Sequence, residues 1–540
     1  MPASFANQGR GLKELPAIHA LAWTAGIITA ICLAFEPCWE TNDDVAMSMI
    51  AHGYGLAAYG SPYLVVPNVL WGYLVRSIPS VNGVLGYSIA TLAILLAVGG
   101  ATLYFLLRLG AGYITGLLAV ALIIAQPTLF PQLTKNAGLL TAAAIIGWQV
   151  YARFGGVGNL VIACIFAFLG YLIRDKEFLL VLGVALPLLP WRALRERRQM
   201  QVAFLLLGIA IASAAAFNRW SYNGPEWSHF QGMDPNRSPI TNFVNYGADW
   251  YLQQHPEIIA RHGYSKNDVA LIGNWFFVDP QIADLKSLEA LLTELGPIPM
   301  QENSVQSGIA ALKTLADPML LPLVLPALLL LVLAPSRKVM FAWVLCLAAL
   351  FTIGVMGRPG QFRVYVPLVC LLFVAPHMFG GCKENIRQKI AALTLFAACV
   401  GNAYVLIPRA LEVKQLIREA QMDISRLPAE PIFSWAQSFP FEFVFPVLAN
   451  NPSSRNIRLY GLDSFTHAPF SVAAAEQAAG RGMVKRLQTE AGIPVVASQE
   501  RLELLRVYCR ERLYGQLRGL AKQRLLSMVV YQVRCESPFR

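Results

Sequence analysis

Long apolar segments recur along the chain, separated by short polar turns and by three longer polar regions. A helix needs about 20 residues to cross the roughly 30 Å hydrocarbon core of a bilayer. The apolar segments approach that length, and we predict eleven membrane-spanning helices from them. They lie at residues 16–35, 84–107, 112–130, 137–151, 157–173, 178–191, 202–217, 319–333, 340–356, 364–379 and 390–407. An odd number of spans puts the two ends of the chain on opposite sides of the membrane.

The composition supports a membrane protein. Of the 540 residues, 56% are hydrophobic and only 14% are charged, whereas an ordinary soluble chain is about 25% charged. The mean hydropathy is +0.49, which excludes a disordered chain. We therefore expect an all-α polytopic membrane bundle that carries a small α/β periplasmic C-terminal domain.

The net charge of +11 gives the orientation. If the N-terminus is cytoplasmic, the inner turns hold thirteen basic residues and only three acidic ones, Glu14, Glu196 and Glu384, so they carry a net charge of +10. This bias follows the positive-inside rule, so nucleic acid is a poor explanation of the charge. The inner basic residues are Arg10, Lys13, Arg108, Arg153, Arg192, Arg195, Arg197, Arg198, Arg337, Lys338, Lys383, Arg387 and Lys389.

Three regions then face outward. Two are loops of a transmembrane module, 1–408, and lie at 36–83 and 218–318. The third, 409–540, is the C-terminal domain, in which we expect strands within 431–444 and a helix over 500–533. Its two cysteines, Cys509 and Cys535, are candidates for a disulfide in an oxidising compartment, although either could instead pair with Cys38.

The first outer loop contains the strongest candidate chemistry. Thr41 or Asn42 is placed to cap a helix whose first turn holds Asp43 and Asp44. Capping is the ordinary explanation of such a pair. The functional explanation is that one of the two aspartates is a general base that deprotonates an acceptor hydroxyl.

The rest of this loop suggests how the acidic pair is held. Val45, Met47, Met49 and Ile50 make an apolar surface suited to lying along the membrane, and 65–78 is expected to form a second interfacial helix. His52 and Tyr54 follow the acidic pair closely. We add both to the substrate-binding candidates, with Asn42.

Basic residues at outward turns are the second candidate feature. Arg174 and Lys176 lie between the fifth and sixth predicted spans, and Arg358 and Arg363 between the ninth and tenth. Outward arginine runs against the charge bias and needs an anionic partner, such as acidic side chains, lipid headgroups or a substrate phosphate. A satisfied salt-bridge turn is the ordinary explanation for residues 174–177. Asp268, in the second loop, is a further acidic candidate.

On these features, the chain resembles the GT-C superfamily of membrane glycosyltransferases. The resemblance rests on the first span, the long outer loop with Asn42, Asp43 and Asp44 near its start, the span count, and the outward Arg174 and Arg358. It implies a polyprenyl-phosphate-linked sugar donor, Asp43 or Asp44 as the base for inverting transfer, and Arg174 and Arg358 at the donor phosphate.

The resemblance also implies a multi-pass protein of the bacterial inner membrane that acts on a periplasmic glycan, lipid or protein acceptor. It predicts no certain cofactor and leaves room for a divalent metal. Two branches of the superfamily usually have Asp-Glu at the motif, so the Asp-Asp pair leaves the acceptor open.

Other functions are consistent with parts of the pattern. An O-antigen polymerase or ligase is also polytopic with a large outer loop, but should tolerate the loss of either aspartate. A lipid-linked sugar transporter or flippase predicts charged or broken helices at mid-membrane and internal repeats. A membrane-anchored assembly protein would act through its tail.

Overall fold

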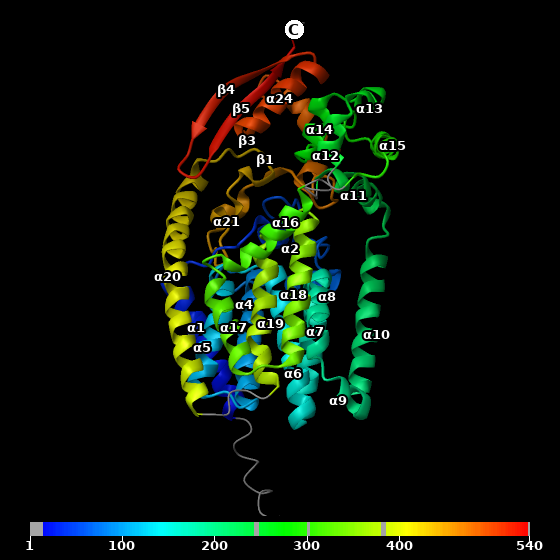
Figure 1. The fold of residues 1–540 in the computed structure, drawn as a ribbon. Coiled ribbons are helices and arrows are strands. Elements are labelled where there is room, and N and C mark those ends of the chain that lie inside the picture. The colour runs from blue at the N-terminus through cyan, green and yellow to red at the C-terminus, as the bar shows by residue number, and fades with distance from the viewer. Residues whose placement is uncertain (1–14, 242–247, 300–302, 380–384, 538–540) are drawn as a thin grey trace, which may run out of the picture.

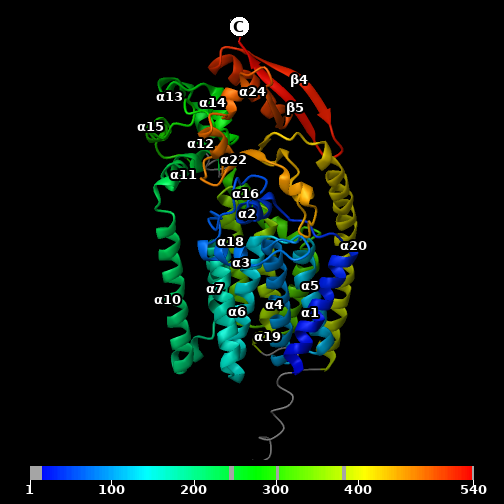
Figure 2. The ribbon, with the colours of Figure 1, turned by 180° about the vertical axis from the view of Figure 1, so that it is seen from behind.

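The computed structural model describes residues 15–241, 248–299, 303–379 and 385–537. It consists of a bundle of long helices with a layer of shorter helices and one sheet at a single end (Figures 1 and 2). Cys382 and five charged residues used in the orientation argument lie outside the described residues: Arg10, Lys13, Glu14, Lys383 and Glu384.

Each of the eleven predicted apolar segments contains helix. Eight of them match one helix each, with boundaries close to those expected: α1 (Leu15–Ala34), α4 (Gly86–Arg108), α5 (Tyr113–Leu129), α6 (Leu133–Phe154), α7 (Val157–Ile173), α10 (Arg198–Ser221), α18 (Arg337–Val355) and α19 (Phe362–Met378). The agreement follows from the length of the apolar runs, which turn residues interrupt at both ends.

The remaining three segments differ from simple spans. The segment 178–191 is broken into α8 (Asp175–Val184), the 3-10 turn Leu186–Leu188 and the start of α9 (Trp191–Glu196). Pro187 and Pro190 fall at this break, as expected for residues that lack a backbone donor. Helix α17 (Leu321–Leu333) is bent by 86° from the preceding Ser304–Ala316 segment, which contains α16 (Ser304–Lys313). Helix α20 (Asn385–Asp423) continues through Pro408, where the C-terminal domain was expected to begin.

Five helices of the described chain are long and apolar enough to cross a membrane, or six if the bent pair counts as one span. Three more helices, α5, α7 and α19, are apolar but only 17 residues long. The structure therefore supports a multi-pass membrane bundle, and the count of eleven spans stays a prediction.

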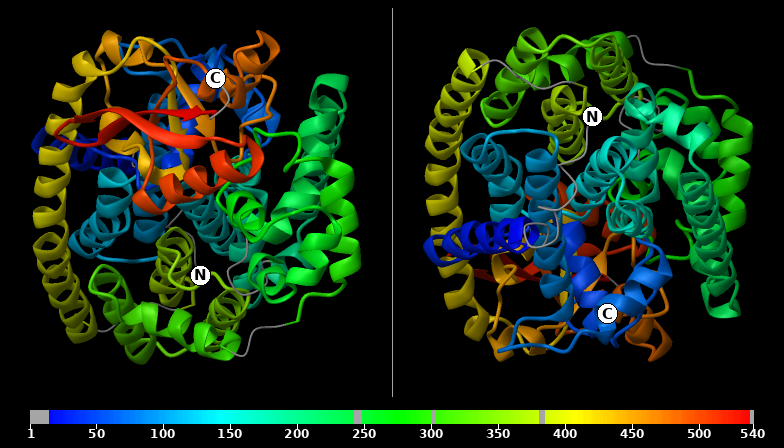
Figure 3. Two further views of the ribbon diagram at one scale, coloured as in Figure 1. Left: turned by 90° about the horizontal axis from the view of Figure 1, so that it is seen from above. Right: turned by 90° about the horizontal axis from the view of Figure 1, so that it is seen from below.

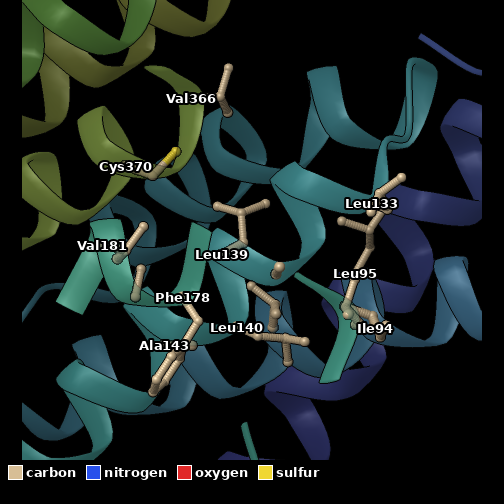
Figure 4. Close-up of a cluster of buried hydrophobic side chains, with 14 of the residues drawn as sticks. Ile94, Leu95, Leu133, Leu139, Leu140, Ala143, Phe178, Val181, Val366 and Cys370 are labelled. Carbon is tan, nitrogen blue, oxygen red and sulfur yellow. The ribbon is translucent and has the colours of Figure 1, made fainter. Parts of the chain in front are cut away.

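Helix α6 lies in the centre of the bundle, with nearly all its side chains buried from Leu133 to Tyr151. Figure 4 shows its Leu139, Leu140 and Ala143 among buried side chains from neighbouring helices. Small residues on α6 allow this packing: a Cβ added to Gly138 would lie 2.4 Å from the Cβ of Pro367 in α19. Close approach through small residues is the ordinary way that membrane helices associate.

All three regions predicted to face outward lie at the same end of the bundle. Figures 1 and 2 place there α2 (Asn42–His52), α3 (Val69–Ser77), the helices between α10 and α17, and the C-terminal sheet, whereas α1 begins at the other end. Views along the bundle place α10 and α20 at opposite edges (Figure 3). The described parts of the three regions thus lie together, and their outward orientation stays a prediction.

Helix α3 confirms a helix within 65–78, but α2 does not lie on the membrane as expected. Val45, Met47, Met49 and Ile50 have no exposed surface. The C-terminal region contributes to this burial, since the amide of Leu459 donates to the carbonyl of Gly55, just beyond α2. The apolar face of α2 was therefore interpreted wrongly: it packs against protein.

The C-terminal region forms the small α/β unit that was expected. Its sheet has the order β2-β1-β3-β5-β4, with β1 (Ile432–Trp435), β2 (Leu459–Leu462) and β3 (Ile493–Val496) parallel, and β5 (Val529–Glu536) antiparallel to both β3 and β4 (Gln516–Arg524). Of the expected strands in 431–444, only β1 forms. The helix expected over 500–533 ends as α24 (Gln499–Arg512), because the chain turns near Gly515 into the β4–β5 hairpin.

A disulfide joins α24 to β5. It links Cys509 and Cys535, whose Cα atoms are 5.8 Å apart. Cys38 is a free, buried thiol whose Sγ donates to the carbonyl oxygen of Glu442 at 3.4 Å. The pairing within the tail is therefore the correct choice among those left open by the sequence.

Candidate active site

Helix α2 presents its two first-turn aspartates to different surroundings. Its N-cap is Thr41, and the Thr41 side chain makes no capping hydrogen bond. Asp43 is half-exposed, with 49% of its side chain accessible, and its Oδ2 accepts from Arg363 Nη1 at 2.9 Å. Arg363 lies in the first turn of α19, so a contact between residues 320 positions apart defines this site.

Asp44 is fully buried beside Asp43. Its Oδ1 accepts from the Tyr87 hydroxyl and from the Leu133 amide, each at 3.0 Å, while its Oδ2 is buried without a hydrogen-bond partner. Burial raises the pKa of Asp44 well above its ordinary value; the charge of Asp43 raises it further, and the two hydrogen bonds and Arg363 oppose the shift. The Asp44 carboxyl thus holds α2 against α4 and α6, and Asp43 carries the accessible carboxylate.

Three arginines lie close to Asp43. Arg174 occupies the N-cap position of α8 without a capping hydrogen bond from its side chain, and Arg358 lies in the turn before α19. Burial lowers the pKa of each of these two guanidinium groups, the charge of Arg363 lowers both further, and the charge of Asp43 raises both. These mutual effects show that Arg174, Arg358 and Arg363 lie close enough to one another and to Asp43 for their charges to interact, and their role in a substrate site stays a prediction.

The charged residues 174–177 do not pair fully with one another, as a salt-bridge turn would require. Asp175 and Lys176 are exposed, and the amide of Lys176 donates to Asp175 Oδ1 at 2.7 Å. Glu177, in contrast, is buried, and its Oε1 lacks a hydrogen-bond partner. The turn therefore directs Arg174 and Glu177 inward and leaves Lys176 at the surface.

A second charged group lies near the N-terminus of α2. Lys135, in the first turn of α6, has no exposed surface, and its ammonium donates to Glu40, Gln126 Oε1 and the Phe130 carbonyl at 2.9 to 3.0 Å. A buried charge needs such pairing. Glu40 Oε2 and Gln126 Nε2 remain buried without partners.

A cavity of about 300 Å³ opens beside this second group. Its polar wall is formed by Glu40, Gln126, Arg409 of α20 and Glu442 of α21 (Phe441–Val444). Burial raises the pKa of Glu442 to about 7; a backbone hydrogen bond opposes that shift, and the charge of Asp43 adds to it. Sequence reasoning missed Glu40, Arg409 and Glu442, because no local pattern indicates that the C-terminal region returns to the first loop.

The other predicted site residues have different surroundings. Asn42 is the first residue of α2. His52, at the far end of α2, accepts from the Tyr87 amide at 3.2 Å; burial, with the charges of Arg455 and Arg76, lowers its pKa to about 4. The Tyr54 hydroxyl is buried and donates to Ser48 Oγ at 2.9 Å. His52 and Tyr54 thus support α2 from within the protein.

Asp268 does not join the cluster. It closes the capping box of α14 (Lys266–Gly273) with Ser265 and forms an ion pair with Arg512 of α24. Figure 1 shows α14 beside α24 in the outermost layer, away from α2. These contacts give Asp268 a structural role between the second loop and the C-terminal unit.

The carboxylates of the site do not make an ordinary protein metal centre. In the part of the chain that the structure describes, no three His, Cys, Asp or Glu side chains gather in a metal-binding group. The Asp44 and Glu40 carboxyls, each with one unpartnered oxygen, are held by separate hydrogen-bond networks, and the unpartnered Oε1 of Glu177 lies in α8. We therefore assign no step to a metal.

The position of Glu442 predicts a pH-dependent stability. Its pKa is about 4.5 when unfolded and about 7 when folded, so the folded state holds its proton more tightly. Stability from this group is complete below pH 4.5 and is lost as the pH rises through 7, by about 3 kcal/mol at about 1.4 kcal/mol per unit. We expect Glu442→Gln to raise the melting temperature at pH 8 and to change it little near pH 4.5, measured by tryptophan fluorescence in detergent.

Glu412→Gln is the matched control for this experiment, since Glu412 is exposed on α20. It should give a melting temperature that follows the unmodified protein at each pH. A difference between Glu442→Gln and the unmodified protein that stays constant from pH 4.5 to 8 would contradict the assignment.

Neither a protein-family model nor a curated protein matches the chain. Among solved structures, the chain is similar to the crystal structure of ArnT from Cupriavidus metallidurans bound to undecaprenyl phosphate. The match has 12% sequence identity and a TM-score of 0.39, and covers 95% of this chain and 97% of that chain. At this identity and score, the function has to be argued from the site itself.

Proposed function

We propose that this chain is a GT-C-type glycosyltransferase of the bacterial inner membrane. It would transfer a sugar from a polyprenyl-phosphate donor to a periplasmic acceptor, with its C-terminal unit on the periplasmic side. The observation that carries the proposal is the gathering of Arg174, Arg358 and Arg363 around the half-exposed carboxylate of Asp43. Transfer from such a donor needs an anion site for the phosphate and one base beside it.

The arginine cluster suits a phosphate because guanidinium groups bind phosphate oxygens in a fork of donors. Arg363 is held by Asp43 in the described structure. A phosphate bound between the three arginines would compete for Arg363 and release the Asp43 carboxylate. Donor binding would thereby release the base from its ion pair when the leaving group is in place.

The transfer step then balances with these side chains. The acceptor hydroxyl oxygen forms a bond to the anomeric carbon, and the bond from that carbon to the phosphate oxygen breaks. The electron pair leaves with the polyprenyl phosphate, whose charge the arginines stabilise. Asp43 takes the hydroxyl proton, which is general base catalysis by a carboxylate positioned beside the reaction.

A binding experiment tests the anion site without knowledge of the sugar. The purified full chain in nanodiscs is titrated with a polyprenyl phosphate and with the polyprenyl alcohol of the same length, and bound lipid is measured by native mass spectrometry. We expect the phosphate to bind about tenfold tighter than the alcohol, a preference of about 1.4 kcal/mol. The double variant Arg174→Gln/Arg358→Gln should remove that preference.

Arg192→Gln is the control, because Arg192 is exposed in α9 and pairs with Glu196 at 2.9 Å. It should leave the preference for phosphate intact. Equal binding of the phosphate and the alcohol to the unmodified chain would refute the proposed donor site.

A further inference from the structure

The cavity beside the α2 N-terminus has the chemistry of a second binding site. Two polar side chains on its wall have buried atoms without a hydrogen-bond partner. Gln126 is 4% exposed with an unpartnered Nε2, and Glu40 has an unpartnered Oε2. One is a donor and the other an acceptor, and unsatisfied buried groups of this kind call for an explanation by water or a ligand.

Aromatic rings form much of the remaining wall. Trp39, Phe130, Phe362 and Phe443 line the cavity, and the Arg409 guanidinium lies over the Phe130 ring, 5.3 Å from its centroid. Rings supply flat apolar surface, and the carboxylates, amide and guanidinium supply acceptors and donors. A pyranose ring has the matching chemistry, with apolar C–H faces and a rim of hydroxyls that both donate and accept.

The charges of the cavity favour hydroxyls over phosphate. Two carboxylates, Glu40 and Glu442, line it together with a single guanidinium, that of Arg409. Glu40 is already balanced by Lys135. A phosphate here would meet the Glu442 carboxylate, whereas the cluster around Asp43 offers three arginines.

The position relative to Asp43 fits the acceptor side of the reaction. Asp43 lies close enough to Glu442 for its charge to act on that group, and Phe362, which lines the cavity, precedes Arg363 in α19. In an inverting transfer the attacking hydroxyl approaches opposite the leaving group. With the phosphate at the arginines, the acceptor would reach Asp43 from the cavity.

We propose, on the basis of the proposed function, that this cavity binds one sugar residue of the acceptor. The acceptor is then a carbohydrate or a glycolipid. Glu442 accepts hydrogen bonds from its hydroxyls, so that the C-terminal unit completes the substrate-binding site. Arg409 donates to the same sugar, and Trp39 and Phe443 cover its apolar face.

Binding of methyl pyranosides tests the site without the donor. The detergent-solubilised full chain is mixed with the methyl glycosides of glucose, galactose, mannose and N-acetylglucosamine, and binding is measured by saturation-transfer NMR. At pH 8, where the Glu442 carboxyl is ionised, at least one should bind, and Glu442→Gln should weaken it about tenfold, as expected for the loss of hydrogen bonds to a charged group. Arg409→Gln, at an exposed position, is a second variant that should also weaken pyranoside binding.

The controls separate this inference from the proposed function. Glu412→Gln and the double variant Arg174→Gln/Arg358→Gln should leave pyranoside binding unchanged, although the double variant should remove the preference for polyprenyl phosphate. If no pyranoside binds, or if Glu442→Gln and Arg409→Gln both bind as the unmodified chain does, the sugar site is refuted. Equal binding of polyprenyl phosphate and polyprenyl alcohol to the unmodified chain would refute the donor site. Pyranoside binding would then be unaffected.

Discussion

Replacement of Asp43 by Asn should reduce sugar transfer by about 10³-fold, within the range that general base catalysis contributes. Asn keeps the size of the side chain but cannot take a proton. The measurement is release of polyprenyl phosphate from polyprenyl-phosphate-linked sugars by the chain in nanodiscs, with a cell-envelope extract as the source of acceptor. An O-antigen polymerase should tolerate this change, so the result also separates the two enzyme classes.

Asp44→Asn is the matched control. Asp44 is fully buried, and its Oδ1 accepts hydrogen bonds from Tyr87 and Leu133. Asn retains an oxygen that can accept both hydrogen bonds. We expect transfer to fall by less than about tenfold, because the proton acceptor is intact. A severe loss in Asp44→Asn together with a mild one in Asp43→Asn would assign the base to Asp44 instead.

The sequence predicted the parts of the fold that local patterns determine. Long apolar runs located the helices of the bundle, and Thr41 with two acidic residues located the start of α2. It could not predict what covers the apolar face of α2, because part of that cover comes from some 400 residues further along the chain. The hairpin after α24 was missed for a related reason: β4 is almost wholly exposed, so its residues lack the alternation that marks a half-buried strand.

The candidate site shows the same division. The sequence indicated Arg174, Arg358 and Arg363 because positive charge at an outward turn runs against the charge bias. It indicated Asp43 because that residue lies in the first turn of a capped helix. Glu442 was overlooked, although it is the single charged residue in the aromatic-rich run 439–448. Its role depends on the burial that the fold imposes on it and on the proximity of Asp43.

Lys135→Met should lower the free energy of unfolding by about 3–5 kcal/mol, the usual cost of removing one partner of a buried ion pair. All three donors of the Lys135 ammonium are used, by Glu40, Gln126 and the Phe130 carbonyl. Methionine would leave these three acceptors without their common donor. The measurement is equilibrium unfolding of the purified chain by denaturing detergent, followed by tryptophan fluorescence.

The double variant Glu40→Met/Lys135→Met should recover much of that loss, because it removes the buried carboxylate that the single variant leaves unpaired. Lys176→Met, at an exposed lysine, should change the stability by less than about 0.5 kcal/mol. A change of under about 1 kcal/mol in Lys135→Met would show that water replaces the ammonium at no great cost. If instead the variant folds normally but loses its preference for polyprenyl phosphate, Lys135 belongs with the arginines as a phosphate ligand, and the anion site extends across both sides of α2.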